Sequence, residues 1–323
     1  MLNIINNRQA SHKHSYKKLV GYNCFDCLIY LFCQWYGISI SPFFIDCFQF
    51  ICTFDKNKSY DWKDSCIWHE ISPKSIINLE DQGLHINFVK KDECVTSSIE
   101  RVIKNGTPIG MEIFREDVYW DKHGMLFHDL HFITIISIEG KNAICADLFL
   151  LDDCFVLPLD FIKNSSRKFI IPSFMNSDVP LDIEKYRLDS LKHIKSLRHK
   201  ASLKNFNDLI EVFINDKRLI AKIQDIYKIP LFYDIANTGW KRAHYAKFLS
   251  FLNECDPRDN NIFIISKTND LSKKWHVLGQ IFAKMMFSGN AEQYGKKLMD
   301  LFHIIRVDEL FLLDELIKSL SNN

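Results

Sequence analysis

Two hydrophobic patterns follow one another along the chain. Up to about residue 175, an opening segment with helical spacing is followed by short apolar runs of the strand type. From Pro180 onward, apolar residues recur at helical spacing and strand signals almost disappear. Helix first and sheet afterwards is typical of an α+β arrangement, here followed by an all-helical part. We therefore expect two domains, residues 1–178 and residues 179–323.

The segment after Gly21 has the features of a helix with defined ends. Apolar residues such as Cys27 and Leu31 recur at helical spacing, and Gly37 stands where a C-terminal cap belongs. Cys24 falls at the opening of this helix, where the helix dipole and unpaired backbone N–H groups favour a thiolate. The sequence therefore makes Cys24 a candidate nucleophile, with a buried structural cysteine as the alternative.

The remaining elements of the first domain are mostly strands. Leu84–Lys90 alternates apolar and polar residues, which indicates a half-buried strand. Two further runs are joined by Glu139-Gly140-Lys141, which is typical of a hairpin. The other predicted elements are a helical segment from Pro42 to Cys52, a short helix from Pro73 towards Gly83, a helix over 93–105, and strands at 108–114, 130–138, 142–149, 155–159 and 168–174.

The second domain is predicted to be entirely helical. Its aromatic residues, Tyr245 and Phe248 among them, recur at the spacing of a buried helix face. We expect joints at Pro230, at Gly239 and in the loop 256–261. The predicted helical stretches are 182–227, 241–254, 271–287 and 291–320.

Composition excludes several classes of protein. Hydrophobic residues make up 47% and charged residues 25%, and the net charge is +1, which gives no basic field for nucleic acid. No segment reaches the ~18 uninterrupted apolar residues of a membrane span. The sequence contains no Gly-rich nucleotide loop, and its first residues contain no apolar run long enough to predict a signal peptide. We expect a cytoplasmic protein.

Ten unevenly spaced cysteines also fit a reducing compartment, with most thiols in the core. Cys24-x-x-Cys27 is compatible with a redox pair or half of a zinc site, but no second Cys-x-x-Cys is present. Cys27 falls on the predicted buried face and is expected to be a core residue. We expect no bound metal.

The hairpin supplies groups that complement a cysteine nucleophile. His131 stands at the start of one strand and Asp147 near the end of the next. In an antiparallel pair these ends lie side by side, so the carboxylate can orient the imidazole. Together with Cys24 they form a nucleophile, a base and an orienting acid.

These features resemble known families. The helix from Cys24 to Tyr36-Gly37 and the following hairpin are similar to papain-like cysteine enzymes of the bacteriocin-leader-peptidase type. A closer resemblance is to the H-type acyltransferases of butirosin biosynthesis. It rests on Asn23-Cys24, an acidic and aromatic loop from Glu112 to Tyr119, His128-Asp-Leu-His131, and the helical second half around Trp240.

The resemblance implies acyl transfer in natural-product biosynthesis of the nonribosomal peptide type. The acyl or aminoacyl group would come from the phosphopantetheine thioester of an acyl or peptidyl carrier protein. It would pass through a thioester on Cys24 to a small amine, with His131 as general base and acid and Asp147 fixing the imidazole. No cofactor would be bound directly. The candidates for substrate binding are Glu112, Asp117, Tyr119 and His128, with a solvated loop as the alternative for the first three.

The chain departs from the peptidase pattern at two points. No Gln occupies the usual oxyanion position, so the backbone N–H of Cys24 would act with Asn23, Tyr22 or Lys18. Leu148 follows Asp147, where the peptidases tend to have proline. A thioester is easier to open than an amide, so both differences favour the transferase.

The alternatives are a papain-like peptidase, a thioesterase or cyclase, and a non-catalytic scaffold whose helical domain binds a partner. A further alternative is that the helical domain forms a homodimer. A metal site built from His123, His128 and His131 with Asp121 or Asp129 is less consistent with this segment, which reads as a loop leading into a strand.

Overall fold

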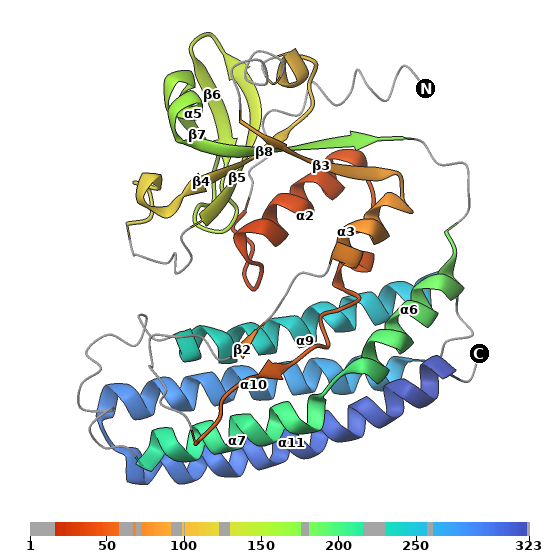
Figure 1. Cartoon of the computed structure of the whole chain (residues 1–323), viewed down its shortest axis with the longest axis vertical. Helices are drawn as coiled ribbons and strands as arrows, with labels where there is room; N and C mark the ends of the chain where they lie inside the picture. Colours follow the sequence, from red (N-terminus) through yellow and green to blue (C-terminus); the bar gives the residue numbers. More distant parts are fainter. Residues whose placement is uncertain are drawn as a thin grey trace. The chain divides into compact units, whose positions relative to one another are not determined.

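The computed structural model describes residues 17–57, 67–68, 73–91, 99, 101–122, 130–175, 181–215, 230–256 and 261–321 (Figure 1). These residues form one six-stranded antiparallel sheet, one two-stranded sheet and a set of helices, which confirms the α+β class. The chain divides into a sheet unit, Met1–Ile40 with Leu79–Val179, and a helical unit, Ser41–Asn78 with Pro180–Asn323.

Helix α2, Cys24–Tyr36, begins and ends at the predicted residues. The Asn23 side chain accepts a hydrogen bond from the Asp26 backbone N–H at 2.7 Å, and the Asp26 carboxylate accepts one from the Asn23 backbone. This capping box satisfies two amides that the helix itself leaves without acceptors. Gly37 closes the helix with a φ of 68°, a value that favours glycine. Cys24 is thereby fixed as the first helical residue.

The six-stranded sheet contains every strand that the sequence predicted in this region, although the run from Asn142 ends at Ala146 rather than Phe149. Its spatial order is β3-β8-β4-β5-β6-β7, and all neighbours are antiparallel. The strands are β3 (Leu84–Lys90), β4 (Ile109–Phe114), β5 (Leu130–Glu139), β6 (Asn142–Ala146), β7 (Phe155–Pro158) and β8 (Ser166–Phe174). Short helices η3 (Arg115–Asp117) and α5 (Leu159–Ser165) lie between strands, and α3 (Pro73–Glu80) spans the division between the units.

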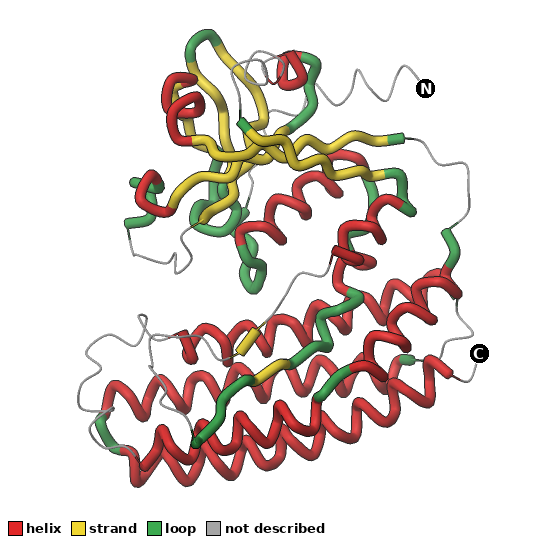
Figure 2. Tube along the Cα trace, in the orientation of Figure 1, coloured by secondary structure: helices red, strands yellow, loops and turns green. Residues whose placement is uncertain are grey.

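Helix α2 lies against one face of this sheet (Figures 1 and 2). The Phe25 ring contacts the Phe132 ring of β5 edge-on, with 5.2 Å between centroids. Gly110 of β4 permits this close packing, because a Cβ atom there would lie 2.7 Å from a methyl group of Leu28. The opposite face carries a buried apolar cluster that includes Met111, Ile133 and residues of α5.

The helical unit contains five long helices, α6 (Ile183–Ser196), α7 (His199–Asn215), α9 (Pro230–Cys255), α10 (Ile262–Ser288) and α11 (Ala291–Ser321), among its described residues. Tyr245 and Phe248 of α9 are fully buried, as their spacing predicted. The predicted joint at Gly239 is wrong, since this residue lies inside α9. Glycine is needed there because a Cβ atom would stand 2.8 Å from the His276 ring of α10. None of the described helices is long and apolar enough to cross a membrane.

The segment after Ser41 differs from its prediction in both structure and partner. It forms a short 3-10 helix, η2 (Ser41–Phe44), and then strand β1 (Ile51–Cys52), which pairs with β2 (Ile67–Trp68), instead of a continuous helix. Phe48 and Phe50 are fully buried, and Phe50 packs against Trp275 of α10 and Phe206 of α7. These rings complete the core of the helical unit, so residues 41–78 belong to that unit rather than to the first domain.

The fully buried carboxylate of Glu309 in α11 lies at the centre of a hydrogen-bond network that connects the segment 41–78 to the helices. It accepts hydrogen bonds from Arg242, Trp275 and His199 at 2.9, 2.7 and 2.9 Å. Arg242 also donates to the Cys47 carbonyl oxygen, and its guanidinium lies 4.4 Å from the centre of the Phe48 ring. Burial by itself raises the pKa of Glu309, but Arg242 and His199 lower it to about 2.

We predict that Glu309→Gln lowers the free energy of unfolding by about 3–5 kcal/mol at pH 7, because Arg242 is left buried without its counter-charge. The depressed pKa means that Glu309 contributes stability above its unfolded value of about 4.3 and loses it as the pH falls towards 2. Urea denaturation at several pH values measures both effects. The control is Glu315→Gln, which removes a more exposed ion pair with Lys318; equal losses in the two variants would contradict the account.

Candidate active site

Asp147, directly after β6, accepts hydrogen bonds with both of its carboxylate oxygens. One carboxylate oxygen accepts hydrogen bonds from the backbone N–H groups of Phe149 and Leu150 at 3.2 and 3.1 Å. The other oxygen accepts from His131 Nε2 at 2.7 Å and from Trp120 Nε1 at 2.8 Å. Asp147 is 2% exposed, so these bonds form away from bulk water. The predicted pairing of His131 with Asp147 is therefore present in the structure.

His131 is fully buried, and its environment favours the protonated ring. Burial lowers its pKa, but the hydrogen bond to Asp147, the nearby Cys24 side chain and the negative charges of both groups raise it to about 9. Because Asp147 binds Nε2, the ring nitrogen left for the cysteine is Nδ1. Among the described residues, Nδ1 has no hydrogen-bond partner, which leaves it available for proton exchange.

Cys24 is half-buried and is the first residue of α2. Its side chain is one of the groups that raise the pKa of His131. The protonated imidazole and the first turn of the helix both present positive charge to the sulfur. This is the setting in which a cysteine acts as a thiolate nucleophile.

Cys27, one turn further along α2, has a different environment. It is 3% exposed, and burial together with the charge of Asp26 raises its pKa well above the ordinary value. A thiol held in its protonated form is a poor nucleophile and a poor metal ligand. The geometry supports Cys27 as the core residue that its position in the sequence predicted.

The three predicted oxyanion residues have distinct positions. The Asn23 side chain is engaged as the cap of α2, and the Tyr22 ring is buried against Tyr30, with 5.8 Å between centroids. The positive charge of Lys18 lowers the pKa of Cys27, against the larger effect of burial. The backbone N–H of Cys24, as the first amide of the helix, has no acceptor within α2 and is positioned to receive an oxyanion.

Two backbone hydrogen bonds hold the segment before Cys24 against the Asp147 loop. The Lys18 amide donates to the Asp152 carboxylate at 3.1 Å, and the Leu19 amide donates to the Leu148 carbonyl oxygen at 2.7 Å. Both contacts lie within five residues of Asp147 along the chain. They bring the loop that precedes the nucleophile beside the loop that orients the base.

The residues predicted to bind substrate do not form one cluster. Glu112 is buried on the opposite face of β4 from Ile113, which pairs with His131, and one of its oxygens accepts from Lys168 at 3.5 Å. Asp117 ends η3 and is half-buried, whereas Tyr119 is 66% exposed and contacts the Trp120 and Phe161 rings edge-on. His128 lies outside the described residues.

Trp120 is the site residue that sequence reasoning missed. Its indole N–H donates to the same carboxylate oxygen as His131, and its ring packs 4.8 Å from that of Phe155. The only signal for it in the sequence was its place in the loop between two predicted strands, since its partner is distant along the chain. It is a second donor that holds the Asp147 oxygen bound by His131.

No cluster of three or more His, Cys, Asp or Glu side chains suited to a metal ion occurs in the described part of the chain. His123 and Asp129 of the alternative metal set lie outside that part. The chain matches no protein-family model, and no curated protein is similar enough to count as a relative.

We predict that Asp147→Asn lowers the pKa of His131 from about 9 to well below that value. Burial depresses this pKa, and the variant leaves Cys24 as the main group opposing it. NMR titration of the histidine ring protons measures the shift. Asp153→Asn, at an exposed position in the same loop, is the control and should leave the pKa of His131 near 9. A pKa near 9 in both variants would show that Asp147 does not hold the imidazolium.

Proposed function

We propose that this protein is a cysteine-dependent acyltransferase built on a papain-like sheet unit. Cys24 is the nucleophile, His131 the proton carrier, and Asp147 the group that orients the ring. The observation that carries this proposal is the buried His131, bound to Asp147 at 2.7 Å on one nitrogen, with a pKa raised by Cys24 as well as by Asp147. A structural histidine would not require a half-buried thiol at a helix N-terminus beside its other nitrogen.

The first half of the reaction forms a thioester on the protein. The Cys24 thiolate attacks the carbonyl carbon of an acyl thioester, and the new S–C bond forms as the donor's S–C bond breaks. The proton on His131 passes to the departing thiolate, which leaves as a thiol. Acylation also removes the negative charge of Cys24, one of the causes that raise the pKa of His131, so the ring releases its proton more readily at this stage.

The second half transfers the acyl group to an amine. A neutral amine attacks the thioester carbon, the nitrogen gives its proton to His131, and the Cys24 thiolate leaves. The starting ion pair is restored and no redox partner is needed. The backbone N–H of Cys24 supports the developing oxyanion in both halves, with the Lys18 charge close by.

The donor we propose is the phosphopantetheine thioester of an acyl or peptidyl carrier protein, on the basis of the resemblance to the butirosin-type acyltransferases. Exchange of one thioester for another needs little leaving-group assistance, which suits a site without the usual oxyanion glutamine. The eight described cysteines are all free thiols, which supports a reducing compartment such as the cytoplasm. Hydrolysis to the acid, as by a thioesterase or peptidase, is the competing outcome at the same thioester.

We predict that wild-type protein and Cys27→Ala gain the mass of the acyl group when mixed with acyl-loaded carrier protein, and that Cys24→Ala does not. Intact-protein mass spectrometry measures the adduct, and Cys27→Ala is the matched control because the two thiols lie one turn apart on α2. Addition of a primary amine should then discharge the adduct as an amide rather than as the acid.

Three results would contradict the proposal. An adduct that depends on Cys27 would move the nucleophile, and cleavage of a peptide with no thioester transfer would favour a peptidase. No adduct from any carrier-bound donor in the wild type, together with unchanged folding of Cys24→Ser, would favour a non-catalytic scaffold.

A further inference from the structure

The Asp147 carboxylate has a donor for each of its lone pairs. Oδ1 receives the backbone N–H groups of Phe149 and Leu150, and Oδ2 receives Trp120 Nε1 and His131 Nε2. An ionised carboxylate offers about four acceptor sites, so these four donors fill them. Because Asp147 is buried, the loss of one donor would leave an acceptor site without a partner.

Trp120 and His131 share one oxygen, at 2.8 and 2.7 Å from Oδ2. A hydrogen bond donated to a carboxylate stabilises its ionised form. The indole N–H is a donor only, so it stabilises the negative charge on Oδ2 without taking part in proton exchange. Without the indole bond, Oδ2 would compete more strongly for the proton on Nε2. A ring that lost this proton to Asp147 would no longer carry a positive charge.

Packing alone does not explain a tryptophan at position 120. Its buried ring contacts those of Tyr119, Phe155 and Phe161, with 5.1, 4.8 and 6.3 Å between centroids. Phenylalanine also packs in such an aromatic cluster, whereas tryptophan adds an N–H group that usually has a partner when it is buried. The acceptor of that N–H group is the oxygen that binds His131.

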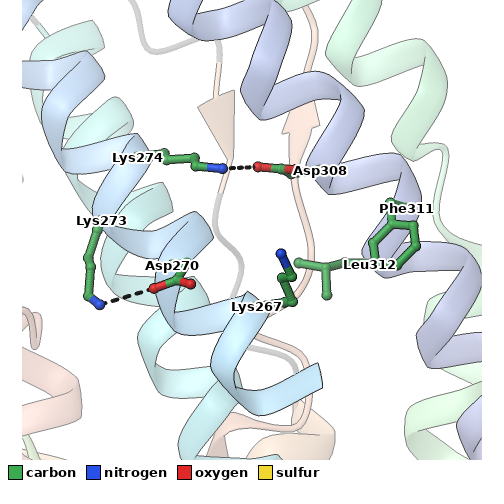
Figure 3. A pocket seen from close by; sticks show the side chains of 7 residues that line it. All are labelled: Lys267, Asp270, Lys273, Lys274, Asp308, Phe311 and Leu312. Carbon is green, nitrogen blue, oxygen red and sulfur yellow. Dashed lines mark hydrogen bonds and ion pairs between the residues drawn. The ribbon is translucent and has the colours of Figure 1, made fainter. Parts of the chain in front are cut away.

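A surface carboxylate of the helical unit holds its counter-charge differently. Asp308 of α11 pairs with Lys274 of α10 beside a pocket of about 290 Å³, and both side chains are partly exposed (Figure 3). Lysine remains protonated at neutral pH, so this pair needs no further group to keep its charges. Among the described residues, the positive charge bonded to Asp147 is the ring of His131, which exchanges protons. A neutral donor such as Trp120 can therefore affect where that proton resides.

We propose that Trp120 is a positioning residue of the acyl-transfer site, whose hydrogen bond to Asp147 keeps His131 charged and thereby keeps Cys24 a thiolate. The inference rests on the proposed function, since it gives Trp120 a part in activating the same nucleophile. Trp120 acts only through Asp147 and His131. Its bond does not depend on the proton at Nδ1, so Asp147 is held in place while the ring gives up and regains that proton.

The test is the pH dependence of Cys24 alkylation by iodoacetamide in full-length wild type and Trp120→Phe, located by peptide mass spectrometry. Phenylalanine retains an aromatic ring and removes the N–H donor. In Trp120→Phe, the pH at which Cys24 reaches half of its maximal rate should rise by about 1 unit, the effect of one hydrogen bond to a charged group. A purely structural role would change the stability of the protein but not this midpoint.

Two control variants should keep the wild-type midpoint. Phe155→Leu removes a ring that packs against Trp120 but retains the indole N–H. Trp275→Phe makes the same substitution in the helical unit, where the indole donates to the buried Glu309 carboxylate at 2.7 Å. Circular dichroism identifies the folded variants.

A measurement on the wild type does not depend on the folding of any variant. Because Trp120 and His131 donate to the same oxygen, the NMR signal of the Trp120 indole N–H should shift with pH at the midpoint of the His131 ring protons. An indole signal that does not follow this titration would overturn the inference.

A wild-type midpoint in folded Trp120→Phe would overturn the inference and leave the proposed function intact. An equal rise in Phe155→Leu would do the same, because packing rather than the N–H group would then be responsible. If Cys24 of the wild type reacted no faster than the exposed Cys255, the proposed function itself would be contradicted, and this inference with it.

Discussion

The Asp147 carboxylate is the interaction on which the candidate site depends. Its two oxygens receive hydrogen bonds from its own loop, from Trp120 and from His131, and the bonds from Trp120 and His131 are buried. With Nε2 of His131 occupied, Nδ1 is the nitrogen left for Cys24, and the ring remains protonated at neutral pH. The helix cap at Asn23 fixes the position of Cys24, because it sets the residue at which α2 begins.

The helical unit contains a buried carboxylate, that of Glu309, whose partners resemble those of Asp147. The two carboxylates differ in the group that supplies the positive charge. Glu309, like Asp147, accepts hydrogen bonds from a tryptophan indole and a histidine Nε2. Glu309 also binds Arg242, which neutralises it inside a fully buried core. Among the described residues, no arginine bonds the Asp147 carboxylate; the positive charge near it is held by His131, and that charge can move as a proton. An immobile counter-charge stabilises a fold, whereas a transferable one supports chemistry.

Local signals made much of the sheet unit predictable. The cap at Asn23, the glycine at Gly37 and the alternation of Leu84–Lys90 each lie within the element that they define, and the hairpin brought His131 beside Asp147. The role of Trp120 was not predictable, because its partner lies 27 residues away and no pattern near it indicates that contact. The same holds for the segment from Ser41, whose helix-like apolar pattern reflects burial among distant helices. An apolar pattern in the sequence indicates that residues are buried, but it does not indicate which surface covers them.

The most direct test of the account is the rate at which iodoacetamide alkylates each cysteine near neutral pH, located by peptide mass spectrometry. We expect Cys24 to react fastest, well ahead of the exposed Cys255, and Asp147→Asn to remove this advantage while the protein remains folded. If Cys24 reacted no faster than Cys255, or if its rate did not respond to Asp147→Asn, then Cys24, His131 and Asp147 would not act as one catalytic unit.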